Sequence, residues 1–239
     1  DNLSNSADYG TLIQEAMSQD ILYLISVIGV VICGIVFFFW YQYEIKGEIR
    51  GSLRSVFTGK HFTLLIFMGI GCQFFVSGSM SIIQQFFKEL FADYAKQVEM
   101  LTSGNDIVVL LLLIIIAPVT EELIFRGVIL HKTSRYIPFM GANILQAILF
   151  GLYHQNIIQG IYAAIIAFLL GFVYYKFKTI FASMLLHMIV NASSLLLVIF
   201  PQNYFYYCIL ILVGIIFSTI ALCLLKLSET LVPKEVKLE

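Results

Sequence analysis

The sequence predicts an all-α fold, a polytopic transmembrane helical bundle. Of its 239 residues, 60% are hydrophobic and only 12% are charged, whereas soluble domains contain about 45–50% apolar and about 25% charged residues. Apolar segments approaching the ~20 residues that a membrane helix requires recur along the chain. Basic residues follow every second segment, as in chains that cross a bilayer repeatedly. We therefore expect a multi-pass protein of a cell membrane, embedded in the lipid bilayer.

About seven segments are predicted to span the membrane. The fourth and fifth meet at the short polar patch 154–156, so the boundary between them is weakly defined. The stretch 84–106 places aromatic residues at helical spacing between charged ones, which indicates an amphipathic helix at the membrane interface. The predicted spans are 21–43, 62–83, 107–130, 139–155, 157–175, 180–200 and 204–225.

The basic residues predict the orientation of the chain. Lys88 and Lys96 are the only Lys or Arg residues in loops on one side, and Arg126 lies within a span. By the positive-inside rule, the N-terminus is therefore expected outside and the C-terminus in the cytoplasm. The remaining basic residues follow the first, third, fifth or seventh span, and are Lys46, Arg50, Arg54, Lys60, Lys132, Arg135, Lys176, Lys178, Lys226, Lys234 and Lys237.

The length and composition predict one membrane domain over residues 1–239. No internal repeat or linker divides the chain, and the formal net charge of −1 gives no reason to expect a nucleic-acid partner. The cysteines lie in apolar runs without zinc-finger spacing. The first apolar run follows acidic residues and lacks a basic segment before it, so we expect no cleavable signal peptide.

Three charged residues, Glu121, Glu122 and Arg126, lie within the stretch APVTEELIFRGVIL of the third predicted span. Each charge at the centre of a membrane helix costs about 2.5–3.5 kcal/mol on insertion scales, so such charges are functional candidates. Glu122 and Arg126 are four residues apart and can pair on one helix face. Glu121 points about 100° away from Glu122. It is therefore available for a role other than this ion pair.

Further polar residues are predicted to lie at the depth of Glu121. His187 and Asn191 share one face of the sixth span, and His154 lies near the end of the fourth. In a hairpin that turns near Pro138, straight helices place Glu121 and His154 at similar depth, about 10–16 Å below the cytoplasmic surface. His187 and Asn191 fall in the same range. We therefore expect these four residues to meet in one pocket.

Such a pocket could hydrolyse a peptide bond. A carboxylate removed from water is a stronger base, and Glu121 could take a proton from a water held between it and His154. The water would then attack a peptide carbonyl. His187 and Asn191 could donate hydrogen bonds to the oxyanion that develops.

Three motifs follow in order on three predicted spans. EExxxR begins at Glu121, FxxxH begins at Phe150 and HxxxN begins at His187. Together they resemble the CPBP family, which comprises the CAAX-prenyl proteases and the bacteriocin-processing or immunity proteins also called Abi. We interpret 107–200, which carries the motifs, as the catalytic core.

The resemblance implies an intramembrane endopeptidase of the glutamic type. It assigns the base to Glu121, the holding and activation of water to His154, and the oxyanion site to His187 and Asn191. The resemblance also gives Glu122 and Arg126 a supporting role, while Phe150 is expected to pack below the site.

A zinc-dependent mechanism is the alternative, because the family was first described as metalloproteases. His154, His187 and Glu121 could ligate Zn²⁺. However, the sequence contains no HExxH motif, and the same residues suffice for a mechanism without metal. We therefore expect no cofactor, with zinc as the alternative.

Some bacterial members of the family process bacteriocin leaders or quorum-sensing pheromone precursors. The Ile- and Phe-rich composition, in which Lys is more frequent than Arg, is typical of low-GC Gram-positive bacteria, which do not prenylate CAAX proteins. We therefore expect a bacterial plasma-membrane protein whose substrate is a small membrane-associated peptide or protein. A non-proteolytic CPBP member, acting as an immunity factor or membrane-protein regulator, is the alternative. A proton-coupled transporter is a weaker one, since no inverted repeat is visible.

Overall fold

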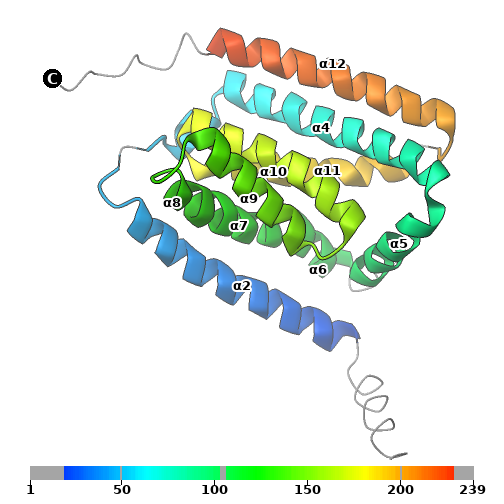
Figure 1. The fold of residues 1–239 in the computed structure, drawn as a ribbon, viewed down its shortest axis with the longest axis horizontal. Coiled ribbons are helices and arrows are strands. Elements are labelled where there is room, and N and C mark those ends of the chain that lie inside the picture. Colours follow the sequence, from blue (N-terminus) through cyan, green and yellow to red (C-terminus); the bar gives the residue numbers. More distant parts are fainter. Residues whose placement is uncertain (1–18, 49, 103–105, 200, 229–239) are drawn as a thin grey trace, which may run out of the picture.

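The computed structural model describes residues 19–48, 50–102, 106–199 and 201–228, and within them the fold is helical without strands (Figure 1). The segment before residue 19, where no signal peptide is expected, lies outside these residues, as do Lys234 and Lys237. The elements are α2 Gln19–Glu44, α3 Leu53–Val56, α4 Gly59–Phe86, α5 Lys88–Thr102, α6 Asp106–Leu111, η1 Leu112–Ile116, α7 Ala117–Glu122, η2 Leu123–Leu130, α8 His131–Thr133, α9 Phe139–Tyr153, α10 Ile157–Phe177, α11 Ile180–Leu195, η3 Leu196–Ile199 and α12 Tyr204–Ser228.

Within the described residues, five helices are long and apolar enough to cross a membrane. Two predicted spans correspond to shorter apolar helices, α9 with 15 residues and α11 with 16 residues. At 1.5 Å per residue each covers about 23 Å, less than a hydrocarbon core of about 30 Å. The predicted total of seven spans and the predicted orientation therefore stay predictions. The five long spans are Leu24–Glu44, Gly59–Phe86, Ile107–Thr133, Ile157–Phe177 and Tyr204–Leu225.

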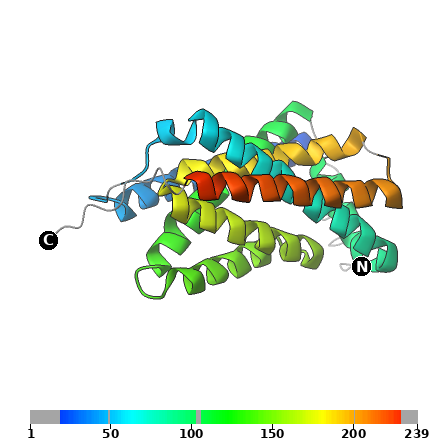
Figure 2. The ribbon, with the colours of Figure 1, turned by 90° about the horizontal axis from the view of Figure 1, so that it is seen from above.

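The helices pack as a bundle in which α4 and α12 lie side by side (Figures 1 and 2). Small residues bring these two backbones together, as is common between membrane helices. A Cβ atom on Gly214 would lie 2.5 Å from the backbone nitrogen of Phe75, and one on Gly71 would lie 2.8 Å from that of Ser218. Helix α11 packs against α4 as well. Helices α9 and α10 form a hairpin, and α10 packs against α11.

The third predicted span differs from the straight α-helix that was assumed. Its segments η1 and η2 are π-helical and flank the short α-helix α7, which carries both glutamates. A π-helix bonds each N–H to the carbonyl five residues back, and such segments are often found at functional sites. The assumption of a regular 3.6-residue period is therefore wrong on both sides of Glu121.

The predicted hairpin turn and the predicted amphipathic helix are both present as local structure. After α8 the chain turns, and α9 starts behind the N-cap residue Pro138. The amphipathic stretch forms α5, which is shorter than the predicted 84–106 and starts after a break at Phe87. In α5, Phe91 is buried, while Leu90, Lys88 and Asp93 are exposed. The placement of α5 at a membrane interface stays a prediction.

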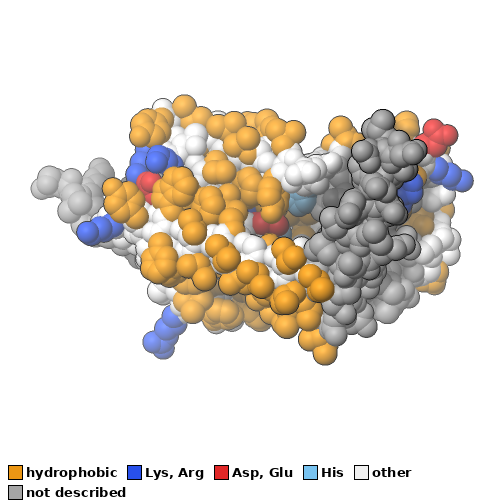
Figure 3. Space-filling view, turned by 90° about the horizontal axis from the view of Figure 1, so that it is seen from below, with side chains coloured by type: hydrophobic (Ala, Val, Ile, Leu, Met, Phe, Trp, Pro, Cys, Tyr) orange, Lys and Arg blue, Asp and Glu red, His pale blue; other side chains and the backbone are white. Residues whose placement is uncertain are grey.

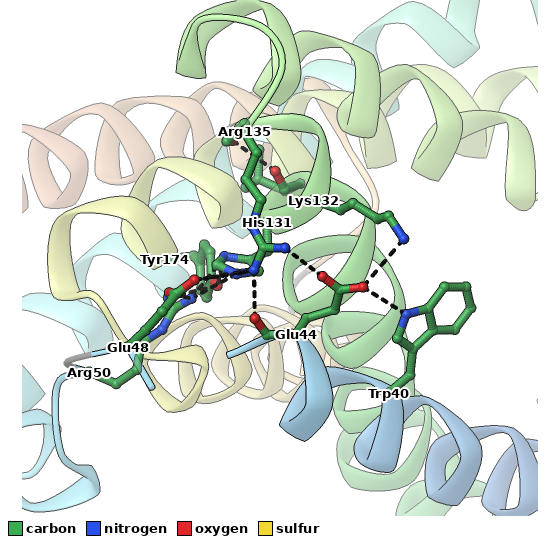
Figure 4. Close-up of polar contacts among 10 residues, drawn as sticks. Trp40, Glu44, Glu48, Arg50, His131, Lys132, Arg135 and Tyr174 are labelled. Carbon is green, nitrogen blue, oxygen red and sulfur yellow. Dashed lines mark hydrogen bonds and ion pairs between the residues drawn. The ribbon is translucent and has the colours of Figure 1, made fainter. Parts of the chain in front are cut away.

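A polar network ties the ends of three helices together (Figure 4). Glu44, the last residue of α2, accepts hydrogen bonds from Lys132 at 3.3 Å and from Arg135 at 2.8 Å. Arg50, in the loop after α2, donates to the hydroxyl of Tyr174 near the end of α10 at 2.9 Å. Arg50, which follows the first predicted span, thus lies at the same end of the bundle as Lys132 and Arg135, which follow the third.

Glu48 belongs to the same network, in the loop outside the spans. Partial burial favours the neutral form of its carboxyl group, but Arg50, His131 and Arg135 favour the carboxylate and hold its pKa below its usual range. The carboxylate lies 2.6 Å from Arg50 and 3.1 Å from His131. The anionic side chain therefore offsets part of the positive charge at this end of the bundle.

Candidate active site

A pocket of about 440 Å³ lies between η1, α7, the α9–α10 turn and α11. All four predicted catalytic residues line it, so the structure brings Glu121, His154, His187 and Asn191 together. Figure 3 shows an acidic and a histidine side chain, red and pale blue, close together among apolar side chains on one face. The complete lining is Leu113, Ala117, Glu121, Phe150, Tyr153, His154, Gln155, Gln159, Tyr162, Ala163, Ile166, His187, Val190 and Asn191.

The adjacent glutamates occupy different surroundings, as their helical phase predicts. The side chain of Glu121 retains 14% of its exposure and lines the pocket, with Oε2 3.7 Å from Nε2 of His187. Glu122 and Arg126 are fully buried, and their charged groups are 2.9 Å apart. Arg126 also donates to the carbonyl of Ala167 on α10 at 3.0 Å. Glu122 is thus held by its ion pair, while Glu121 faces the space where a substrate would lie.

Glu122 also determines the orientation of His187, which the sequence did not predict. Nδ1 of His187 lies 2.8 Å from Oε1 of Glu122. Because a carboxylate only accepts hydrogen bonds, the proton on this side belongs to the imidazole. A neutral ring then leaves an acceptor at Nε2, whereas the imidazolium has a second donor there. His187 can therefore donate a hydrogen bond into the pocket only in its protonated form.

His154 is positioned by the sharp turn between α9 and α10. It is the C-cap residue of α9, and its Nδ1 donates to the carbonyl of Phe150 at 2.8 Å. The neutral ring therefore carries its acceptor on Nε2. Gln155 follows in the left-handed region with φ +55°, and the side chain of Asn156 caps α10 by accepting from the backbone nitrogen of Gln159 at 3.0 Å. This turn places His154 in the wall of the pocket.

Asn191 joins α11 to the π-helical segment η1. Its amide nitrogen donates to the carbonyl of Leu113 at 2.8 Å. An amide has two N–H groups, so one remains for another acceptor. This contact fixes the amide plane beside Glu121 and His187, and it depends on the position of a carbonyl in η1.

Phe150 does more than pack below the site. Its ring is 2% exposed and lies between the two histidines, with centroid distances of 4.8 Å to His154 and 5.9 Å to His187. The guanidinium of Arg126 lies 4.8 Å from the same centroid, a distance at which cation–π attraction operates. Phe150 therefore forms the floor that separates the buried Glu122–Arg126 pair from the pocket.

Sequence reasoning missed two buried amides on α9 that support this floor. Gln146 donates to the carbonyl of Ala167, which also accepts from Arg126, and to Asn143 at 2.8 Å. Asn143 donates to the carbonyl of Phe168 at 3.0 Å. The only signal in the sequence is that two amides stand three residues apart in an otherwise apolar segment, and they share one helix face.

The zinc alternative depends on how His154, His187 and Glu121 are placed. Among the described residues, no group of three His, Cys, Asp or Glu side chains is arranged to hold a metal ion. Glu122 engages Nδ1 of His187 and the carbonyl of Phe150 engages Nδ1 of His154, so each ring keeps Nε2 for the pocket, where it can meet either a water or a metal ion. The choice between the two mechanisms is therefore made by experiment.

A carboxylate, two imidazoles and an amide line one pocket in an apolar helical bundle, so the fold and the pocket together define a polytopic membrane protein with ionisable side chains in its interior. Residues 103–193 match the family of type II CAAX prenyl endopeptidase Rce1-like proteins. This match confirms the CPBP resemblance of the motifs, all of which lie within the matched segment, and supports a protease of the CAAX type. No curated protein and no solved structure gives a match to the chain.

Proposed function

We propose that this protein is an intramembrane endopeptidase of the glutamic type, in which Glu121 and His154 activate a water molecule. The observation that carries the proposal is that Glu121, His154, His187 and Asn191 line one pocket inside an apolar bundle. The family match over the same segment supports a peptidase reaction. The burial of Glu122 by Arg126 leaves Glu121 as the glutamate that reaches the substrate.

The proposed reaction begins with proton transfer from water to the carboxylate of Glu121. The Nε2 lone pair of His154 accepts the second hydrogen of the water as a hydrogen bond and aims its oxygen at the scissile carbonyl carbon. The carbonyl becomes a tetrahedral oxyanion. When the C–N bond breaks, Glu121 returns its proton to the leaving amine and ends the cycle ionised.

His187 and Asn191 stabilise the oxyanion. Asn191 donates through the N–H that Leu113 does not use, and His187, whose Nδ1 is held by Glu122, donates through Nε2 when both ring nitrogens carry a proton. Both donors are positioned before the reaction starts, by contacts that the substrate does not have to form. Preorganised donors of this kind stabilise the transition state more than the bound substrate.

The proposed substrate is a small membrane-associated peptide or protein of the pheromone or bacteriocin-precursor type. The pocket is lined in part by two of the long apolar helices, so a substrate already held in the membrane would lie beside the helices that form the site. We place the protein in a bacterial plasma membrane.

The proposal is tested by comparing the peptides that accumulate in cells producing the wild-type protein or Glu121→Gln. We expect a shortened peptide only with the wild type, and its precursor with the variant. Identical peptide profiles would favour the non-proteolytic alternative, an immunity factor or membrane-protein regulator.

The role of metal is tested on the purified protein with the same substrate. We expect cleavage to survive prolonged chelation and to be unchanged by added zinc. Loss of cleavage on chelation, restored by stoichiometric Zn²⁺, would instead make His154 and His187 ligands.

A further inference from the structure

A second cavity, of about 640 Å³, adjoins the catalytic pocket. We name it the α4 cavity, because α4 contributes one of its walls, while α5, α10, α11 and α12 contribute the others. The two spaces share the side chains of Tyr162, Ile166, Val190 and Asn191. The two spaces therefore meet at Asn191, the proposed oxyanion donor, so the α4 cavity lies next to the position proposed for the scissile carbonyl.

The wall formed by α4 is a polar stripe within an apolar helix. Gln73, Ser77, Ser81 and Gln84 recur at intervals of three or four residues and all line the cavity. This spacing places them on one helix face. The mean hydropathy of the span is nevertheless 1.7. Polar groups inside a membrane helix are unfavourable against lipid, so they face the interior or a water-filled space, where they mark binding sites.

The described lining of the α4 cavity contains no charged side chain. Lys88 and Asp93 lie on α5, but the residues of α5 that reach the cavity are Phe91, Tyr94 and Ala95. The hydroxyl of Tyr94 lies 3.0 Å from that of Tyr162, so a hydrogen bond fastens α5 across the cavity at the boundary with the catalytic pocket.

We propose that the α4 cavity binds the part of the substrate peptide on one side of the scissile bond, and that it selects an uncharged, polar segment. This rests on the proposed function. An extended peptide carries N–H and C=O groups, which need new partners wherever the protein wall displaces their water. The amides and hydroxyls of the α4 stripe supply both donors and acceptors. A charged residue would meet no counter-charge among the described residues that line the cavity, and apolar side chains make up much of the remaining wall.

The same lining disfavours a lipid chain as the occupant. A hydrocarbon chain satisfies none of the polar groups of the stripe and would remove them from water. The structure contains another groove, between α2 and α11, whose lining is almost wholly apolar and includes Phe38, Leu123 and Met184. That groove suits a hydrocarbon chain better than the α4 cavity does, whereas the polar stripe of the α4 cavity suits a peptide better than a hydrocarbon chain.

The test measures the binding of peptides to the full-length Glu121→Gln variant in detergent. This variant is used because it lacks the proposed base and should bind a peptide without cleaving it. The probes are short synthetic peptides that share one apolar half and differ in the other. The second half is rich in Ser, Asn and Gln in the polar probe, rich in Leu in the apolar probe, and contains Lys or Asp in the charged probes. We expect the uncharged polar probe to bind most tightly. Adding Gln84→Leu should raise its Kd about three- to tenfold, as for the loss of one hydrogen bond.

Gln85→Leu is the matched control, because Gln85 is the next residue on α4 and lies outside the cavity lining. It should leave Kd unchanged. If Gln84→Leu does not fold, Ser77→Val compared with Ser79→Val repeats the comparison, since Ser77 lines the cavity and Ser79 does not. The assignment would be overturned if a cavity variant and its matched control, both folded, bound the polar probe with equal affinity. It would also be overturned if the apolar or the charged probe bound most tightly.

The binding result is independent of catalysis. Suppose that the wild-type protein cleaves its substrate, but that a cavity variant and its matched control, both folded, bind the probes equally. The α4 cavity assignment then fails and the protease proposal stands. If the wild type cleaves nothing while binding still depends on Gln84, the protease fails and the cavity remains a peptide-binding site.

Discussion

At the scale of single residues, the site depends on how two adjacent glutamates are separated. Glu121 reaches the pocket, and Glu122 is fully buried against Arg126 and His187. Because Glu122 holds His187, its role extends from charge neutralisation to the orientation of a proposed catalytic side chain. The two carboxyl groups should therefore respond differently to the same substitution.

Glu121→Gln is expected to lower cleavage by a factor of about 10²–10⁴, because it removes the general base while keeping the shape of the side chain. Its melting temperature should stay near that of the wild type. Arg126→Ala should instead reduce the yield of folded protein, since breaking a buried ion pair costs about 3–5 kcal/mol. Cleavage rates and melting curves on the same preparations check both. Equal, mild effects of the two substitutions would contradict this division of roles.

His187 and Asn191 should act on turnover rather than on substrate binding. Loss of one oxyanion donor costs about 2.7–4 kcal/mol in a protease, so Asn191→Ala should lower kcat by about 10²-fold or more with little change in KM. His187→Ala should do likewise, and the double variant should lose less than the product of the two effects. Asn191 also contacts Leu113, so melting temperature must be measured. Lower stability with normal turnover per folded molecule would make the pair structural.

At the scale of elements, the α9–α10 hairpin positions His154 by a very close backbone approach. A Cβ atom on Gly151 would lie 2.5 Å from the carbonyl oxygen of Gly160. That oxygen belongs to the backbone and cannot move without displacing α10. The hairpin therefore depends on glycine at this point.

Gly151→Ala is expected to lower the melting temperature and to impair cleavage, because the helices must separate by a few tenths of an ångström or more near His154. Overpacking of this kind costs about 1–3 kcal/mol. Gly141→Ala is the matched control on the same helix, since its Cβ would meet only Ile137, at 3.5 Å. It should be neutral or stabilising, as alanine favours a helix by about 0.5–1 kcal/mol. Equal melting temperatures of the two variants would refute this packing argument.

At the scale of the whole molecule, the polar network at one end of the bundle joins loops that the sequence assigns to one side. Glu44 and Glu48 bind Lys132, Arg135, Arg50 and His131 there. A backbone hydrogen bond at the same end joins the loop after α2 to the end of α10: the N–H of Gly51 donates to the carbonyl of Lys178 at 2.9 Å. The C-terminal ends of α2, α8 and α10 are therefore on a common side, together with the basic residues that follow or belong to them.

The predicted orientation places this end in the cytoplasm. A reporter that is active only in the cytoplasm, fused after Glu239, should therefore work, because the charge bias keeps these loops on the cytoplasmic side. A reporter active only outside the cell should fail at the same position. The opposite pattern would reverse the topology and place the network of Glu44 and Arg135 on the exterior.

The sequence determined the fold class and the identity of the candidate site. Low charge and recurrent apolar segments require helices in a bilayer, because backbone groups in lipid must bond within their own segment. The pairing of Glu122 with Arg126 followed from their spacing. The meeting of Glu121, His154, His187 and Asn191 was expected from similar depths on three spans, and the structure brings them to one pocket although the third span is not the straight helix assumed.

Only the tertiary structure decided the π-helical segments, the bond from Glu122 to His187, the buried amides Asn143 and Gln146, and the α4 cavity. Periodicity did not reveal η1 and η2, because their residues are almost uniformly apolar and show no change of phase. The other features depend on which faces of distant helices meet. Which faces meet depends on small residues at close helix crossings and on the pairing of buried polar groups. Neither can be predicted from one segment of the sequence alone.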